Sequence, residues 1–94
     1  MIIWDWIKEK KIIDISLKKR KEGNVVVVYG KNLEICYLNK IGGGILYLSA
    51  DNITIKEISS KLLSKYDVDE KVLHDDLIEI IRDLQWKRII KLEG

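Results

Sequence analysis

Three features of the chain carry side chains or backbone suited to chemistry: a histidine beside two carboxylates, a single cysteine and a run of three glycines. His74 precedes Asp75 and Asp76, and a histidine oriented by a carboxylate can act as a general base. These residues fall in a helical pattern, however, and adjacent helix positions point in different directions, so His74 and Asp75 cannot face each other. We therefore interpret His74 as a surface histidine.

The cysteine and the glycines also have structural interpretations. Cys36 is the single cysteine and His74 the single histidine, so an intrachain disulfide or a cysteine-based zinc site cannot form. Cys36 falls in a strand-like run, where cysteine usually serves as a small hydrophobic residue. The run Gly42-Gly43-Gly44 lacks the Gly-Lys-Ser/Thr ending of a phosphate-binding loop, and close helix packing explains it better. We expect no catalytic residues, no metal and no cofactor.

The composition indicates one domain spanning residues 1–94. Ninety-four residues support a single hydrophobic core, and 17 basic against 15 acidic side chains give a net charge of +2, which does not favour nucleic-acid binding. The basic run of residues 18–21 is interpreted as a solvated turn. No apolar run reaches membrane-spanning length and no secretion signal is recognisable. A lone cysteine fits the reducing cytoplasm, which is the expected location.

The N-terminal half is rich in strand-like runs. Residues 25–29 and 33–38 predict a β-hairpin, and the alternating run at 12–17 predicts a third strand, which gives a three-stranded antiparallel meander. Both strands of the hairpin are apolar on both faces, although such a sheet usually exposes one face to water. We expect the N-terminal segment, residues 1–11 with Trp4 and Trp6, to cover the outer face or to form a contact in a homodimer.

The C-terminal half changes to a helical period. Asn39 predicts the start of a helix over residues 40–48, and Thr54 with Glu57 forms a capping-box pattern. Asp69 predicts the start of a third helix, whose apolar residues repeat at three- and four-residue spacing and which ends near Trp86. The sequence thus predicts an α+β, winged-helix-like fold in which a three-stranded antiparallel sheet is followed by three helices.

Several motifs of this half, in this order, resemble the PqqD-like family, the precursor-peptide recognition element of ribosomal peptide natural-product biosynthesis. The resemblance covers about residues 25–92. Arg88 stands where the family often turns at glycine, which suggests that the last helix ends differently or continues into a C-terminal strand. The motifs that carry the resemblance are Tyr37-Leu38-Asn39-Lys40-Ile41-Gly42, Thr54-Ile55-Lys56-Glu57-Ile58, Tyr66-Asp67-Val68-Asp69 and the series Asp76, Leu77, Ile80, Ile81 and Leu84.

The resemblance implies a binding mode. In this family a leader peptide adds as an extra strand to the open edge of the last strand, and its side chains enter a cleft against the third helix. The edge implied here is Leu33, Glu34, Ile35, Cys36, Tyr37 and Leu38, and the helix wall is Leu73, Asp76, Leu77, Ile80 and Asp83. For Leu73, Leu77 and Ile80, packing in the core alone is the alternative interpretation.

The resemblance further implies a non-catalytic adaptor that presents the leader peptide to a radical SAM enzyme or to the leader peptidase and cyclase of a lasso-peptide pathway. The alternatives are a structural or dimerisation module and a winged-helix DNA-binding regulator, since a capped helix, a tight turn and a second helix also make a helix-turn-helix. Carboxylates on the third helix argue against DNA, because they would face phosphates with the wrong sign. The sequence does not identify the precursor or the modification, nor whether the domain belongs to a larger enzyme.

Overall fold

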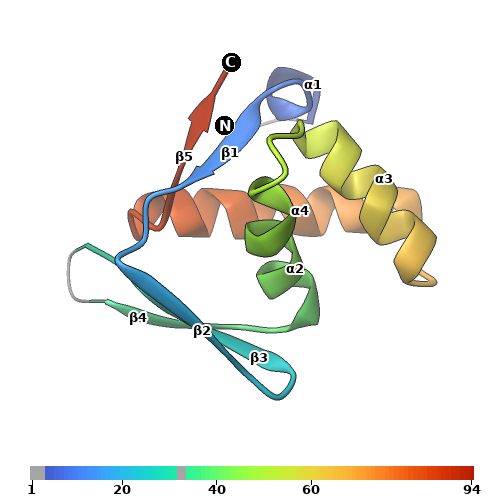
Figure 1. Cartoon of the computed structure of the whole chain (residues 1–94). Helices are drawn as coiled ribbons and strands as arrows, with labels where there is room; N and C mark the ends of the chain where they lie inside the picture. The colour runs from blue at the N-terminus through green and yellow to red at the C-terminus, as the bar shows by residue number, and fades with distance from the viewer. Residues whose placement is uncertain (1–3, 32–33) are drawn as a thin grey trace.

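The chain forms a three-stranded sheet, three longer helices and a separate pair of strands, as the computed structural model of residues 4–31 and 34–94 describes it (Figure 1). This architecture confirms the prediction of an α+β fold in which a three-stranded antiparallel sheet is followed by three helices. The elements are α1 (Trp4–Ile7), β1 (Lys11–Asp14), β2 (Lys18–Glu22), β3 (Val25–Tyr29), β4 (Ile35–Leu38), α2 (Lys40–Ser49), α3 (Ile55–Lys65), α4 (Glu70–Trp86) and β5 (Ile90–Glu93).

The main sheet has the order β2-β3-β4, with antiparallel pairing throughout. Its first strand is the basic run Lys18–Glu22, so the prediction of a solvated turn there is wrong. The run pairs along its whole length with Val25–Tyr29 but remains largely exposed. A strand at the edge of a sheet tolerates charged side chains, and such charges discourage pairing with other chains.

The expected strand at residues 12–17 belongs to a different sheet. Lys11–Asp14 pairs with Ile90–Glu93 at the other end of the chain, which corrects the predicted meander. At the end of β1 the Asp14 carboxylate accepts hydrogen bonds from the Ser16 backbone N–H at 2.9 Å and from Lys19 Nζ at 2.7 Å. Burial alone would raise the pKa of Asp14, but these hydrogen bonds outweigh it and lower the pKa. This corner connects the two sheets.

The helices begin where the sequence predicts. The Asn39 side chain accepts a hydrogen bond from the Gly42 N–H at 2.9 Å, Thr54 and Glu57 form the complete capping box, and the Asp69 carboxylate accepts from the first turn of α4. The last helix ends at Trp86, and Arg88 then adopts a left-handed backbone with φ of 57°. That conformation turns the chain into β5, which is one of the two outcomes that the departure from glycine at Arg88 suggested.

The glycine run lets α2 approach the sheet closely. A Cβ atom on Gly43 would lie well inside the van der Waals distance of Val26 Cγ2 in β3, whereas one on Gly44 would make an ordinary contact with Leu62 Cδ2 at 3.6 Å. Close helix packing therefore accounts for Gly43, whereas Gly44 has room for a methyl group. The core around this contact joins the inner face of the sheet to the helices through Val28, Leu38, Ile45, Leu46, Ile58, Leu62, Leu77, Ile81 and Leu84.

The N-terminal segment does not cover the main sheet in the described residues. Instead Trp4 stacks on His74 of α4, with ring centroids 3.7 Å apart and an interplanar angle of 10°, and Ile7 is buried in the core. The segment packs on α4 because that helix offers it an aromatic and an apolar partner. The prediction that it covers the sheet is wrong for the described residues, its alternative role in a dimer stays a prediction, and Ile2 and Ile3 lie outside the described residues.

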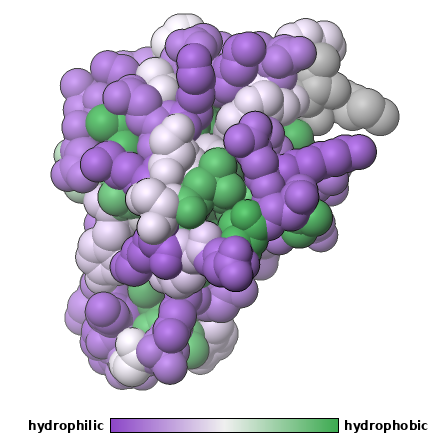
Figure 2. Space-filling model, turned by 90° about the vertical axis from the view of Figure 1, so that its right-hand side faces the viewer, coloured by the Kyte–Doolittle hydropathy of each residue, from purple (hydrophilic) through white to green (hydrophobic). Residues whose placement is uncertain are grey.

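The surface carries few large hydrophobic areas. The face in Figure 2 is mostly hydrophilic, with a small hydrophobic area near its middle. Helices long and apolar enough to span a bilayer do not occur in residues 4–31 and 34–94. The outer face of the main sheet is the exception, because Ile35 and Tyr37 are 52% and 71% exposed there.

We predict opposite effects for alanine at two neighbouring glycines. Gly43→Ala should destabilise the protein by about 1–3 kcal/mol, because the new methyl group collides with Val26. Gly44→Ala should leave stability unchanged or raise it by up to about 1 kcal/mol, because the site has room and alanine favours the helix. Urea denaturation followed by circular dichroism measures both, and equal midpoints for the two variants would contradict the close approach.

Candidate functional site

The outer edge of β4 is unpaired in the described part of the chain, since β4 pairs with β3 on one side alone. Just before β4, the Gly30 N–H donates to the Glu34 carbonyl at 2.9 Å, in register with the ladder. Hydrogen-bonded and non-hydrogen-bonded pairs alternate along an antiparallel ladder. Every second residue from Glu34 therefore bonds to β3, and the residues between them, Ile35 and Tyr37, present their N–H and C=O groups to the open edge.

Side chains of β4 alternate between the two faces of the sheet. Cys36 and Leu38 are buried against the helices, whereas Ile35 and Tyr37 lie on the exposed outer face. Glu34 is exposed at the start of the strand. The sixth predicted edge residue, Leu33, lies outside the described residues. The edge thus offers backbone groups to a new strand, with an apolar inner face beside it.

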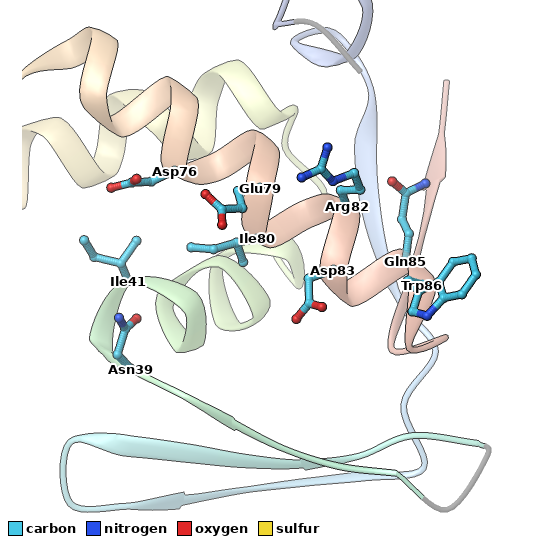
Figure 3. Close-up of a pocket in the computed structure, with 9 residues that line it drawn as sticks. All are labelled: Asn39, Ile41, Asp76, Glu79, Ile80, Arg82, Asp83, Gln85 and Trp86. Atoms are coloured by element: carbon cyan, nitrogen blue, oxygen red, sulfur yellow. The ribbon is translucent and has the colours of Figure 1, made fainter. Parts of the chain in front are cut away.

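A groove of about 1140 Å³ runs along α4 beside the start of α2. Ile80 points toward Ile41 across this groove, and Asp83 points toward the side on which the sheet lies (Figure 3). α4 packs on α1, α3 and β5 but not closely on β4, which leaves the space open on that side. The lining residues are Asn39, Ile41, Asp76, Glu79, Ile80, Arg82, Asp83, Gln85 and Trp86.

The groove has an acidic rim around an apolar centre. Three carboxylates, Asp76, Glu79 and Asp83, line it against one guanidinium, that of Arg82, which Figure 3 shows pointing away from the sheet. Such a surface attracts cationic and polar groups and repels phosphates. The exposed face of α4 is thus unsuited to a DNA major groove.

A lysine next to the groove connects α4 with the sheet. Lys87 Nζ lies 3.1 Å from Asp83 Oδ2 and 3.9 Å from Cys36 Sγ, so it links the last turn of α4 to the inner face of β4. Burial raises the pKa of the Cys36 thiol; the charge of Lys87 opposes this effect and that of Asp83 adds to it. The hydrogen bond to Asp83 raises the pKa of Lys87. The thiol is therefore neutral and the lysine charged near pH 7.

The structure divides the predicted wall residues into two groups. Asp76, Ile80 and Asp83 line the groove. Leu73 and Leu77 are fully buried and belong to the core. For these two leucines the structure agrees with the alternative interpretation, packing in the core alone. Only part of the apolar stripe of α4 faces the groove, and the rest is buried in the core. The spacing of the apolar residues therefore could not distinguish residues that line the groove from core residues.

Sequence reasoning left six lining residues out of the predicted site: Asn39, Ile41, Glu79, Arg82, Gln85 and Trp86. Trp86 is 85% exposed at the end of α4, and it continues the three- and four-residue spacing from Glu79 through Asp83, a signal that could have identified it. Ile41 reaches the groove from α2, and no local pattern places it opposite Ile80. The described residues contain no cluster of three or more histidine, cysteine, aspartate or glutamate side chains suited to a metal ion.

Comparisons with known proteins agree with the fold. The family model described as coenzyme PQQ synthesis protein D (PqqD) matches residues 24–90. The solved structure of TbiB1 in complex with the TbiA(beta) leader peptide is similar, with a TM-score of 0.75 and 23% sequence identity over 86% of this chain and 94% of that chain. At this identity the likeness shows a shared fold. No curated protein matches the sequence.

We predict that Cys36 reacts slowly with iodoacetamide at pH 7, because burial raises its pKa and the thiolate is the reactive form. The alkylation rate, followed by mass spectrometry across a pH series, should rise with a midpoint above the ordinary value of 9.0. Lys87→Met should move the midpoint higher, because the variant lacks the cation that opposes the shift. A midpoint at or below 9.0 in the folded protein would contradict this description.

Proposed function

This chain belongs to the PqqD family, and we propose that it binds the leader peptide of a ribosomally synthesised precursor by strand addition. The open edge of β4 beside the groove of α4 carries this proposal. An extended peptide at such an edge gains affinity from main-chain hydrogen bonds and selectivity from pockets that receive alternate side chains. The open edge and the groove adjoin in the sequence, because β4 ends at Leu38 and the next residues, Asn39 and Ile41, line the groove.

The backbone supplies the affinity in this proposal. Ile35 and Tyr37 direct their N–H and C=O groups outward, so a leader strand pairs with these two residues and becomes the fourth strand of the sheet. Leu33, which the family resemblance also assigns to this edge, lies outside the described residues. Main-chain pairing makes little demand on sequence, so this part of the contact suits many leader peptides.

The groove supplies the selectivity. Leader side chains that point inward meet Ile41 and Ile80 at the apolar centre and the carboxylates of Asp76 and Asp83 at the rim. Burying apolar side chains against these isoleucines stabilises the complex, and the carboxylates favour lysine, arginine or hydroxyl groups on the same peptide. The preferred leader therefore combines apolar residues with neighbouring basic or polar ones.

The protein acts in this proposal as an adaptor. TbiB1, which shares its fold, was solved in complex with a leader peptide. We propose that this chain contributes no catalytic group and no cofactor, and that it presents the leader to a radical SAM enzyme or to a leader peptidase and cyclase. The cytoplasm, where precursor peptides are made, is the proposed place of action.

We predict that Tyr37→Pro abolishes leader binding while the protein stays folded. Proline removes the outward N–H and adds a ring at the open edge, but this N–H does not bond to β3, and proline is tolerated at such edge positions. The affinity for a fluorescein-labelled leader from the co-encoded precursor, measured by anisotropy, should fall at least about tenfold, since one backbone hydrogen bond is worth about 1 kcal/mol before the steric effect.

Tyr37→Ala is the matched control, because it removes the same side chain and keeps the N–H. It should retain most of the affinity. Equal losses in the two variants would assign the effect to the tyrosine side chain and contradict strand addition. Failure of the unchanged protein to bind the leader at concentrations well above micromolar would overturn the proposed function itself.

We predict that Ile80→Asp damages binding more than folding. A carboxylate in the groove stays hydrated in the free protein but loses its water when an apolar leader side chain arrives, at a cost of several kcal/mol. Leader titration beside circular dichroism measures both properties. Val72→Asp, at a position on α4 that is 54% exposed and outside the groove, is the control and should change neither. An unfolded Ile80→Asp protein would place Ile80 in the core, and a folded one that binds normally would remove it from the site.

A further inference from the structure

A second groove, of about 490 Å³, is lined by residues of α2, of the C-terminal half of α3 and of the hairpin between β2 and β3. The two grooves share no lining residue. At the start of α2, Asn39 and Ile41 line the first groove, whereas Lys40 and the following glycines line the second. The complete lining of the second groove is Lys21, Gly23, Asn24, Val26, Lys40, Gly43, Gly44, Tyr47, Leu48, Lys61, Leu62, Lys65 and Tyr66.

The charge of this groove is opposite to that of the first. Its charged lining residues are four lysines, Lys21, Lys40, Lys61 and Lys65, and none of them forms an ion pair with another of the described residues. Lys61 and Lys65 stand four residues apart on α3, where like charges repel. An anionic group bound between them would relieve this repulsion.

Below the lysines the lining is apolar and aromatic. Val26, Leu48 and Leu62 contribute aliphatic surface, and Tyr47 and Tyr66 contribute rings. Lys65 Nζ lies 5.6 Å from the centroid of the Tyr66 ring, close enough for a cation–π interaction. A free phosphate would use the lysines but leave the apolar surface unfilled, whereas a peptide with both carboxylates and apolar side chains complements both parts.

We propose that this second groove binds an acidic polypeptide segment with apolar or aromatic side chains, contributed by a partner protein. The partner and a leader peptide occupy different residues, because the two grooves share no lining residue. A nucleic acid fits less well, since a polyanion extending past α2 would meet Asp76, Glu79 and Asp83. The inference goes beyond the proposed function and is tested without a leader peptide.

The test measures anisotropy of a short fluorescein-labelled peptide that combines repeated glutamates with leucine and tryptophan, titrated with the full chain. The peptide should bind, with an affinity that falls as salt is added, and the same peptide with lysine in place of glutamate should not. Lys61→Glu with Lys65→Glu should weaken binding at least tenfold. Lys71→Glu with Lys91→Glu, which changes the net charge equally at exposed positions outside the groove, should have a much smaller effect.

Three outcomes overturn the proposal. The first is no binding of the glutamate peptide at low salt, and the second is equal weakening by the two double variants. The third is binding of a labelled single-stranded oligothymidylate as tight as that of the peptide with the same response to the variants, which would assign the site to nucleic acid. If the Lys61→Glu, Lys65→Glu protein is unfolded by circular dichroism, Lys61→Gln with Lys65→Gln replaces it and should still weaken binding. Leader titration of these variants separates this result from the proposed function, because binding at the β4 edge should remain unchanged.

Discussion

The close approach of α2 to β3 at Gly43 is the contact on which the rest of the structure depends. Because no side chain separates the helix from Val26, α2 lies directly on the sheet, and residues of α2 line both grooves. Asn39 is the single residue between β4 and α2, and its side chain also caps the N-terminus of the helix. The open edge of β4, Ile41 of the first groove and Lys40 of the second are therefore all positioned by this helix and the residue that begins it.

Local signals predicted the helices well. Asn39, Thr54 and Asp69 each hydrogen-bond to backbone amides within three residues, so the sequence around each cap contains the whole interaction. The strands at Val25–Tyr29 and Ile35–Leu38 were also predicted, because β-branched and aromatic residues concentrate there. In these elements the interactions that fix the conformation are close in the sequence.

Long-range pairing accounts for most of what the sequence did not predict. β1 pairs with β5, whose residues lie almost the whole chain away, and no pattern near either strand identifies the other. The stacking of Trp4 on His74 has the same origin. The basic run of β2 is a different case: its pairing with β3 is local, but its composition favours a turn, so the prediction of a turn was wrong. On α4, Leu77 and Ile80 carry equivalent signals, and the packing of other elements decides that one is core and the other lines the groove.

The charged strand β2 also limits how far the sheet can grow. One edge of the sheet carries the side chains of Lys18–Glu22, which oppose the approach of another strand, and the other edge is the open side of β4. Open-ended strand-by-strand polymerisation needs two receptive ends, and this sheet has one. In the proposed binding mode, strand addition to the main sheet is therefore confined to the β4 edge, which gives one site for a peptide strand on this sheet.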